Sequence, residues 1–364
     1  MINVSNDGNV ANIFYHNDLL SVPGQQKASS IADMTVKKYN KTQALLRLLQ
    51  DGHFHSGQSL GETLGITRSA IWKAIQNLQK QGVEVQSVNG KGYRIPFGLS
   101  LLDPVLINDA LKPEAAPLLN KLVCLENVDS TNDYLLKAVD HNNPKTIACF
   151  AEQQTAGKGR LGREWLSPYG NNIYHSLLWY FDKDPSELMG LSLAIAVATA
   201  RALQTLGIRD HLELKWPNDL LWRSQKFGGV LVEMLAEPQH HCAVVIGIGI
   251  NTRLTLQQSL DRPITSTESI LGKPTNRNVL AAELLNQLLP ALNDFNKNGL
   301  KNFINDWESL DSFRGRMVRL NSTQKEIIGL MRGITLNGEL LLEDTQGRVS
   351  THLSGEMSLR KLKE

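Results

Sequence analysis

The stretch from residue 42 to residue 96 limits the possible folds of this chain most, because caps, turns and a hairpin signal follow one another closely. Ser56 precedes a short helix, Gly65 makes a turn, and Thr67 caps a longer helix, "RSAIWKAIQNLQKQG". The following "VEVQSVNGKGYRI" predicts two strands around Asn89-Gly90, a pair that favours a two-residue hairpin turn. Two helices joined by a glycine turn and followed by a hairpin predict a winged helix-turn-helix.

An earlier helix completes this unit. Thr42 is predicted to cap it and Asp51-Gly52 to end it, and its apolar face is formed by Leu45, Leu46, Leu48 and Leu49. The helix after Thr67 has its own apolar face, formed by Ala70, Ile71, Ala74, Ile75 and Leu78. We therefore predict a compact helical module with a hairpin over residues 40–97.

The opposite face of the longer helix carries polar and cationic side chains, namely Arg68, Ser69, Trp72, Lys73, Gln76 and Asn77. Such side chains reach phosphates and base edges in a major groove. Lys91 and Arg94 on the hairpin add a second positive contact. A small helical packing module is the alternative, but this polar face favours DNA binding.

Composition narrows the remaining possibilities. The formal net charge is only +2, so any nucleic-acid contact comes from a local patch such as this one. With 364 residues, 41 % of them hydrophobic, the chain is long enough for two or three globular domains. Cys124, Cys149 and Cys242 form no C-x-x-C pair, which argues against a zinc site or disulfides and fits a reducing cytoplasm. The apolar run 188–206 contains polar side chains and predicts a buried helix rather than a membrane span.

The first 35 residues differ from the rest of the chain. They are polar, rich in Asn and Ser, and lack sustained periodicity. We predict a disordered arm at residues 1–35, or an extension upstream of a start at Met34. No basic stretch followed by an apolar core is present, so no secretory signal is expected.

Residues 101–312 alternate apolar strand-like runs with amphipathic helices, which predicts a large mixed α/β domain. The strand candidates are "HLELKWPNDLLW", "GGVLVEML" and "AVVIGIGIN". Residues 217–219, Pro-Asn-Asp, mark a sharp turn after a strand, where side chains are commonly presented to a ligand.

Residues 313–364 contain short strands, "RMVRL", "IIGLMRGI" and "GELLLED", with turns at Asn337-Gly338 and Gln346-Gly347. They predict a small antiparallel barrel. A unit of this size has a marginal core alone, so we expect it to pack on the central domain. The fold class is accordingly α+β with several domains.

One stretch is concentrated in glycine and cations: "AGKGRLGREW", residues 156–165. Backbone N–H groups freed by glycine, with cations beside them, suit a phosphate or another anion. The spacing is not that of a Walker loop. Although the glycines match G-x-G-x-x-G, Pro168 and Gly170 argue against the helix that a dinucleotide fold requires. The alternative is a mobile basic surface loop.

Four stretches in order resemble one family. They are "DSTND" at 129–133, "AGKGRLGREW", "KWPNDL" at 215–220 and "GIGIN" at 247–251, and together they are similar to bacterial biotin protein ligase. Preceded by "FHSGQSLGETLGITRSAIWKAIQNLQKQG", they resemble the bifunctional form that is also the biotin operon repressor. The resemblance runs from about Gln43 to the C-terminus. It implies a ligase domain of the biotin/lipoate type followed by an SH3-like β-barrel.

The resemblance also implies an activity with two steps. Biotin reacts with ATP to form biotinyl-5′-AMP and pyrophosphate, and biotin then passes to a lysine of the biotin carboxyl carrier protein of acetyl-CoA carboxylase. Mg²⁺ is expected with ATP, although no ligand cluster in the sequence locates it. The bifunctional form further implies operator DNA of biotin genes and a cytoplasmic homodimer with biotinyl-5′-AMP as corepressor and no membrane partner.

By resemblance, Arg160 and Lys215 contact the biotin carboxylate and the α-phosphate, where two anions meet. Asp219 is assigned to orienting the incoming lysine or taking its proton. Short polar groups suit the ureido ring of biotin, and Asn251 is a further candidate for the ligand; the ureido set is Ser130, Thr131, Asn132 and Gln154. Considered alone, residues 130–132 predict only a helix N-cap, and Lys215 a solvated charge at a strand end.

The resemblance predicts that the loop folds over biotinyl-5′-AMP and shields it from water. Gly157 and Gly159 let the backbone approach closely, and Lys158 helps to close the loop. This loop departs from the commoner all-arginine loop at Lys158 and Leu161, and a lysine offers a point charge instead of a fork.

Two other classes of protein remain as alternatives. A regulator that only senses a small ligand would lack Arg160 or Lys215, yet both are present. A lipoate–protein ligase would share the catalytic fold but is not expected to carry the winged module or this loop.

Overall fold

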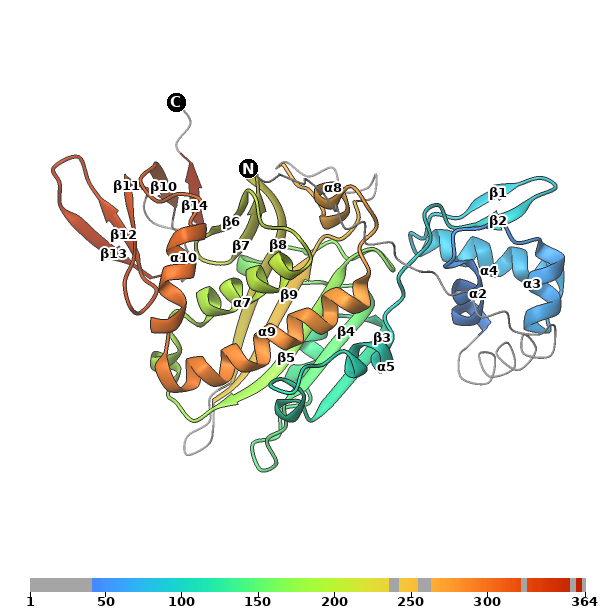
Figure 1. Cartoon of the computed structure of the whole chain (residues 1–364), viewed down its shortest axis with the longest axis horizontal. Coiled ribbons are helices and arrows are strands. Elements are labelled where there is room, and N and C mark those ends of the chain that lie inside the picture. Colours follow the sequence, from blue (N-terminus) through green and yellow to red (C-terminus); the bar gives the residue numbers. More distant parts are fainter. Residues whose placement is uncertain (1–40, 236–241, 255–262, 322–325, 354–357, 362–364) are drawn as a thin grey trace, which may run out of the picture.

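The computed structural model describes residues 41–235, 242–254, 263–321, 326–353 and 358–361. These residues form an N-terminal module, a central layered domain and a C-terminal sheet, in chain order (Figure 1). The arm predicted at residues 1–35 lies outside the described residues.

The N-terminal module has the predicted winged helix-turn-helix order. Its helices α2, α3 and α4 and its antiparallel strands β1 and β2 span Lys41–Leu49, Gly57–Leu64, Arg68–Lys80, Gln86–Val88 and Gly92–Arg94. Ser56 caps α3 and Thr67 caps α4, each accepting a backbone N–H bond, and Gly65 ends α3 with a φ of 62°. The predicted cap at Thr42 is wrong, because Thr42 lies inside α2.

The central domain is built on a seven-stranded sheet of order β3-β4-β5-β9-β8-β7-β6. Strands β3 and β4 are parallel and all other neighbours are antiparallel. Strands β3 to β9 span Lys121–Val128, Ile147–Gln154, Ile173–Phe181, Leu212–Lys215, Asp219–Trp222, Gln225–Leu235 and Cys242–Ile250. The candidate strand at residues 211–222 is therefore a hairpin of two strands, because the turn at 216–218 reverses the chain.

Helices pack on both faces of this sheet, and Figure 1 shows the long helices α7 and α9 on one of them. Long helices α7 and α9 pack on one face and enclose the main core, whereas α6 packs on the other face against a smaller cluster. Side chains of β4 and β5 alternate between these two clusters, as expected for a sheet buried on both faces. Helices α5 to α10 span Pro104–Asp109, Thr131–Leu136, Leu191–Thr205, Thr267–Leu271, Arg277–Asn298 and Ile304–Leu310.

Short 3₁₀ turns complete the domain, at Ala116–Leu118, Arg160–Gly162, Pro185–Leu188 and Lys301–Phe303. The apolar run predicted as a buried helix is confirmed as α7. By length and composition alone, Pro185–Thr205 would be able to cross a membrane, but 67 % of its most apolar window is buried inside the protein. Among the described residues it is therefore a core helix.

The C-terminal region is a five-stranded antiparallel sheet of order β13-β12-β11-β10-β14. Strands β10 to β14 span Met317–Asn321, Glu326–Ile334, Leu340–Glu343, Val349–His352 and Ser358–Lys361. Its buried side chains Val318, Leu320 and Met331 belong to the same core as α7 and α9, so the predicted packing on the central domain is confirmed. The indole Nε1 of Trp216 also donates to Gly338 O, across this interface, at 3.1 Å.

Candidate functional site

A pocket of about 350 Å³ lies on the α6 face of the central sheet. Its size falls within the range of small-molecule sites. The structure brings nearly all predicted site residues to its wall: Ser130, Thr131, Asn132, Gln154, Lys158, Gly159, Arg160, Lys215, Asp219 and Asn251. Gly157 lines an adjoining hollow instead.

One end of the pocket has short polar side chains that bond to one another and to the carboxylate of Glu233. The backbone N and Oγ1 of Thr131 both donate to Gln154 Oε1, at 2.9 and 3.0 Å. Ser176 Oγ lies 2.7 Å from Thr131 Oγ1 and 2.5 Å from Asn132 Oδ1. Asn132 Nδ2 donates to Glu233 Oε2 at 2.6 Å. These bonds fix short donors and acceptors in place, so this end can recognise a small polar ring.

The helix N-cap predicted from residues 130–132 alone is also confirmed. Ser130 is the N-cap of α6 and accepts the backbone N–H of Asp133 at 3.4 Å. Capping orients α6 so that Thr131 and Asn132 lie at the pocket wall. A helix cap and a binding surface are thus combined in the same three residues.

The other end of the pocket is charged. Lys226 Nζ and Lys215 Nζ lie 2.5 and 3.3 Å from the two carboxylate oxygens of Asp219. Burial raises the pKa of Asp219, but Lys226 and Lys215 lower it more, so its pKa lies below the ordinary value. Two ammonium groups share one carboxylate here, which leaves a net positive site suited to an anion.

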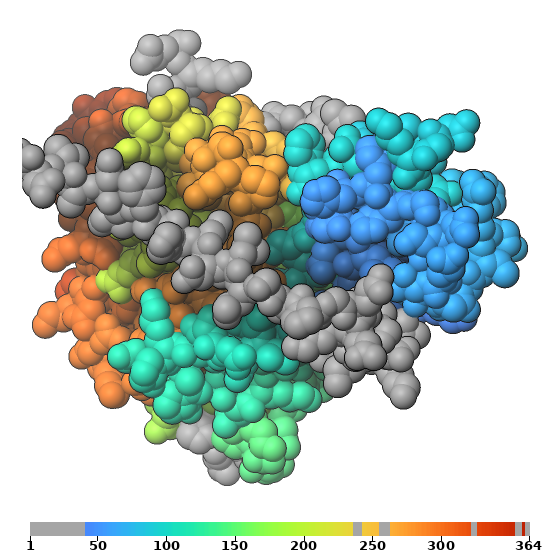
Figure 2. Space-filling view, turned by 45° about the vertical axis from the view of Figure 1, so that its right-hand side comes forward, coloured from blue at the N-terminus to red at the C-terminus, as the bar shows by residue number. Residues whose placement is uncertain are grey.

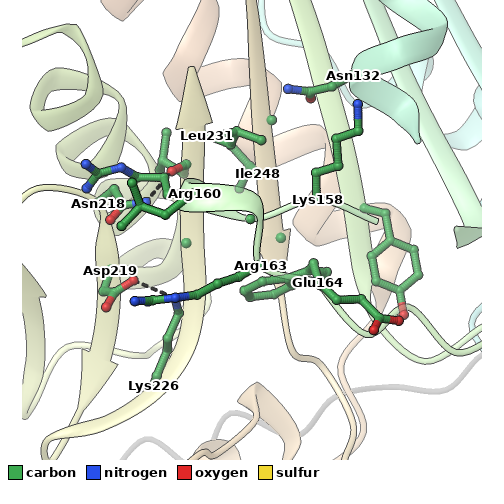
Figure 3. A pocket seen from close by; sticks show the side chains of 18 of the residues that line it. Asn132, Lys158, Arg160, Arg163, Glu164, Asn218, Asp219, Lys226, Leu231 and Ile248 are labelled. Atoms are coloured by element: carbon green, nitrogen blue, oxygen red, sulfur yellow. Dashed lines mark hydrogen bonds and ion pairs between the residues drawn. The ribbon is translucent and has the colours of Figure 1, made fainter. Parts of the chain in front are cut away.

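Arg160 adds a partly desolvated cation to this end. Burial lowers the pKa of its guanidinium, while the nearby Asp219 acts in the opposite direction. Figure 3 shows Arg160 and Arg163 extending to the side where Asn218, Asp219 and Lys226 lie. A cation with reduced hydration interacts more strongly with an anion than one in bulk water.

The glycine-rich loop closes on itself. Gly159 N donates to Arg163 O at 2.7 Å, Trp165 N donates to Gly157 O at 2.8 Å, and Lys158 pairs with Glu164 as an antiparallel bridge. Leu161 takes a left-handed φ of 59° at the tip, which is strained for a non-glycine residue. The loop therefore has a defined backbone conformation held by its own hydrogen bonds.

Lys158 lies away from the other loop cations. Its Nζ pairs with Asp133 Oδ1 on α6 at 2.6 Å, and Figure 3 shows it directed toward Asn132. This hydrogen bond to Asp133, with the charges of Glu233 and Asp129 nearby, raises the pKa of Lys158. The Lys158 charge is thus engaged at the polar end of the pocket, and Asp133 is a partner that sequence reasoning missed.

Glycines on β9 make room for two pocket side chains. A Cβ at Gly249 would lie 2.5 Å from the Trp165 ring, and one at Gly247 would lie 2.5 Å from Asn132 Oδ1. Trp165 therefore lies flat against the strand and forms part of the pocket wall, with Lys226 Nζ 5.5 Å from its ring centroid. The signal for this was present in "GIGIN", since glycine in a strand often marks a close approach.

Asn251, at the end of β9, is bound mainly by protein groups. Its backbone N donates to Phe227 O at 2.7 Å and its Nδ2 donates to Thr265 O at 3.3 Å. It reaches the pocket wall, but these bonds give it a structural role as well.

The winged module presents the predicted polar face. Arg68, Ser69, Trp72, Lys73 and Asn77 are exposed along α4, and Gln76 is half-buried among them. Lys91 is exposed at the hairpin turn. Arg94 is held by a bond to Gln86 Oε1 at 2.9 Å and by the Phe54 ring, 4.6 Å from its guanidinium carbon. Cations and an indole on one helix face and its hairpin match a nucleic-acid contact surface.

Comparison with known proteins agrees with both the pocket of the central domain and the winged module. The Biotin/lipoate A/B protein ligase family matches residues 124–251, and an HTH domain matches residues 41–94. The bifunctional ligase/repressor BirA of Escherichia coli (strain K12) is 41 % identical over 317 residues, 87 % of this chain and 96 % of the relative. The bifunctional ligase/repressor BirA of Bacillus subtilis (strain 168) is 33 % identical over 301 residues, 81 % of this chain and 90 % of the relative.

A solved structure extends the comparison to three dimensions. The biotin protein ligase from Aquifex aeolicus in complex with biotin and ATP superposes with a TM-score of 0.58 at 30 % identity. It covers 67 % of this chain and the whole of that one. Fold and site together define a class, a ligase domain of the biotin/lipoate type joined to a helix-turn-helix module. Within it, the chain belongs to the family of bifunctional biotin ligase/repressors.

Proposed function

We propose that this protein joins biotin to ATP and transfers biotin to a lysine of a biotin carboxyl carrier protein, that of acetyl-CoA carboxylase. We also propose that it represses biotin genes with biotinyl-5′-AMP as corepressor. The main observation is the pocket, which has one end rich in short hydrogen-bonding side chains and one cationic end, in a chain that also carries a winged module. A ureido ring and an acyl phosphate differ in this same way, one neutral and one anionic.

The polar end suits the ureido ring. Gln154, Thr131, Ser176 and Asn132 form one connected set of donors and acceptors there. A ring with one carbonyl and two N–H groups needs both kinds of partner. The valeryl chain then extends toward the cationic end, along the wall formed by Trp165 and Gly249.

The cationic end supports the first chemical step. A biotin carboxylate oxygen attacks the α-phosphorus of ATP, a P–O bond breaks, and pyrophosphate leaves. Two anions approach each other in this step, so Arg160 and Lys215 stabilise the transition state by binding the carboxylate and the α-phosphate. Lys226 and Lys215 both pair with Asp219, so the two lysines carry one more positive charge than this carboxylate neutralises.

In the second step the carrier lysine attacks the acyl carbon of biotinyl-5′-AMP, AMP leaves, and the lysine loses a proton. Asp219 is ionised, with a lowered pKa, and lies at the cationic end, where a carboxylate can orient an incoming ammonium. Among the described residues, no group of three or more His, Cys, Asp and Glu side chains forms a metal cage. Mg²⁺ is therefore expected to be held mainly by the phosphates of ATP, as is usual for this ion.

The module provides the second activity. We infer a homodimer bound to biotinyl-5′-AMP, because one module with few cations binds DNA weakly whereas two linked modules read two half-sites. We place the protein in the cytoplasm, where its carrier and operator partners would lie. We infer domains at residues 40–97, 101–312 and 313–364, the last closing into an SH3-like β-barrel.

A turnover assay with ATP, biotin and a purified carrier domain tests the ligase. Biotin should appear on one carrier lysine with release of pyrophosphate. A regulator that only senses ligand would bind biotin without turnover, and a lipoate–protein ligase would prefer lipoate. Operator binding and sedimentation, with and without biotin plus ATP at one salt concentration, test repression. Equal operator affinity in both states would refute repression and leave the ligase standing.

Substitution of Lys215 tests the assignment of the cationic end. Lys215→Ala should reduce adenylate formation by about 10²–10³-fold, which is common for one lost charge-stabilising contact. Lys226→Ala is the matched control, because it also contacts Asp219 but is not assigned to the α-phosphate. Normal pyrophosphate release by folded Lys215→Ala would remove Lys215 from the mechanism.

A further inference from the structure

A side chain of the catalytic domain completes the core of the DNA-binding module. Tyr169 is only 2 % exposed and packs in the same apolar cluster as the buried side chains of α2, α3 and α4. Its hydroxyl donates to Glu126 Oε1 on β3 at 3.5 Å. Gln43 Nε2, on α2 of the module, donates to Glu126 Oε2 at 2.5 Å. The ring and its hydroxyl partner thus both bind the winged module, which stands at one end of the catalytic body (Figure 2).

Tyr169 follows the pocket loop closely in sequence. Trp165, the last residue of the loop, lies in the pocket wall against Gly249. Ser167 Oγ donates to Trp165 O at 2.9 Å and accepts from Gln154 Nε2 at 3.0 Å. Only three residues separate Trp165 from Tyr169. The end of the pocket loop and the core of the module are therefore joined by a short segment whose side chains and backbone are hydrogen-bonded.

The next bonds hold the far side of this segment. Pro168 O accepts from Tyr174 Oη at 2.8 Å, and Gly170 N donates to Glu152 O at 2.9 Å. The residues on both sides of Tyr169 therefore have fixed partners on the catalytic domain, which hold the Tyr169 ring in the module core a few residues from the pocket loop.

Glu152 joins the same segment to the interdomain linker. Its Oε1 accepts Leu102 N at 2.6 Å and its Oε2 pairs with Arg277 Nη1, also at 2.6 Å. Arg277 is 2 % exposed and donates to Ser100 O at 3.1 Å. Arg277 Nη2 is buried without a hydrogen-bond partner, but the ion pair itself resists rearrangement, because moving one partner would leave the other charge buried and unpaired. The linker and the end of the loop are therefore held by one junction.

We propose that Tyr169 is a positioning residue that couples the pocket loop, residues 156–165, to the winged module. A ligand that closes the loop also fixes the module, and DNA bound to the module slows escape of the ligand. Tyr169 is absent from the pocket wall, so it acts through Trp165 and not by touching ligand. The proposal rests on the proposed function, since the ligand is biotinyl-5′-AMP. Coupling between two sites is reciprocal in binding free energy, so the ligand should tighten DNA binding by the same factor by which DNA tightens ligand binding.

The test measures release of biotinyl-5′-AMP from the full chain, with and without a synthetic duplex of the host's biotin gene promoter. In the wild type the duplex should slow release about five-fold or more, the lower end of usual coupling. In Tyr169→Ala, release without DNA should be several-fold faster and the duplex should change it less than two-fold. The kcat for transfer to the carrier should stay within two-fold of wild type.

The matched control is Leu78→Ala, which removes a buried side chain of the same core from α4. It should weaken DNA binding but leave DNA-free release at the wild-type rate. Tyr169→Phe keeps the ring and should keep most of the coupling. If Tyr169→Ala unfolds the module, Tyr169→Leu replaces it with the same expected result.

The outcomes separate the two claims. A wild type that forms no biotinyl-5′-AMP refutes the proposed ligase. The coupling alone is refuted if the wild type forms biotinyl-5′-AMP and responds to the duplex, but Tyr169→Ala releases the ligand without DNA at the same rate as Leu78→Ala. The coupling is also refuted if the duplex slows release of biotinyl-5′-AMP from Tyr169→Ala as much as from the wild type.

Discussion

Asp311 carries a charge that the fold disfavours, at the joint between the catalytic domain and the C-terminal sheet. It follows α10, and the chain beside it pairs with β6 through Ser312 N and Leu214 O at 2.9 Å. Its Oδ1 accepts Phe313 N at 3.0 Å, whereas its Oδ2 is buried without a hydrogen-bond partner. Burial raises the pKa of Asp311 from 3.8 to about 6, against the lowering effects of Phe313 N and Arg314.

Asp311→Asn should therefore stabilise the protein at neutral pH. A rise of about two pKa units corresponds to about 3 kcal/mol of differential free energy. The folded-state pKa is raised, so the stabilising contribution of protonated Asp311 is complete below pH 3.8 and is lost as the pH rises through about 6. The gain from asparagine, which stays neutral and can still accept Phe313 N, should be largest above pH 7 and about half as large at pH 5.

Thermal and urea unfolding between pH 5 and pH 8 would measure this gain. The matched control is Asp344→Asn in a turn of the C-terminal sheet, because bonds from Arg348 and Gln346 lower the pKa of Asp344. That control should show no gain at any of these pH values. An Asp311→Asn protein whose stability difference from wild type does not change with pH would refute the reasoning.

Two further predictions concern the pocket. In a double-mutant cycle of Lys158→Met and Asp133→Asn, the pair at 2.6 Å should show a coupling of about 0.2–1 kcal/mol in retention of biotinyl-5′-AMP, decreasing with salt; additive effects would show that the pair does not hold the loop. Gly249→Ala should raise the KM for biotin, because its Cβ would lie 2.5 Å from the Trp165 ring, and Trp165→Ala should partly restore it; an unchanged KM for biotin in Gly249→Ala would contradict this.

Much of the module could be predicted from the sequence because its signals are local. A cap bonds three residues ahead and a left-handed glycine ends its own helix, so Ser56, Thr67 and Gly65 need no distant partner to be recognised. The predicted cap at Thr42 was wrong because threonine, a common capping residue, also occurs inside helices. The turn at residues 217–219 was predicted, but the short apolar run after it was not assigned as a separate strand, because its pairing with the run before it is a tertiary contact.

The site could be predicted only in part. Its loop and turn motifs are contiguous, and the structure brings them to one pocket. Their partners are not contiguous: Ser176 lies on β5, Lys226 and Glu233 lie on β8, and no spacing in the chain relates them to residues 130–132 or 219. Such pairings depend on the strand order of the sheet, in which β9 separates β5 from β8.

The loop illustrates how tertiary partners divide roles among similar residues. By composition alone, Lys158, Arg160 and Arg163 are three cations that suit an anion, and only the family resemblance assigns Arg160 to the anion and Lys158 to closing the loop. In the structure Lys158 is neutralised by Asp133 at the polar end, whereas Arg160 is partly buried near Asp219 at the cationic end. A salt bridge to α6 fastens the loop without attracting the carboxylate or phosphate away from Lys215. The lysine that replaces the commoner arginine is thus suited to holding the loop, which supports the proposal that Arg160 and Lys215 bind the anion.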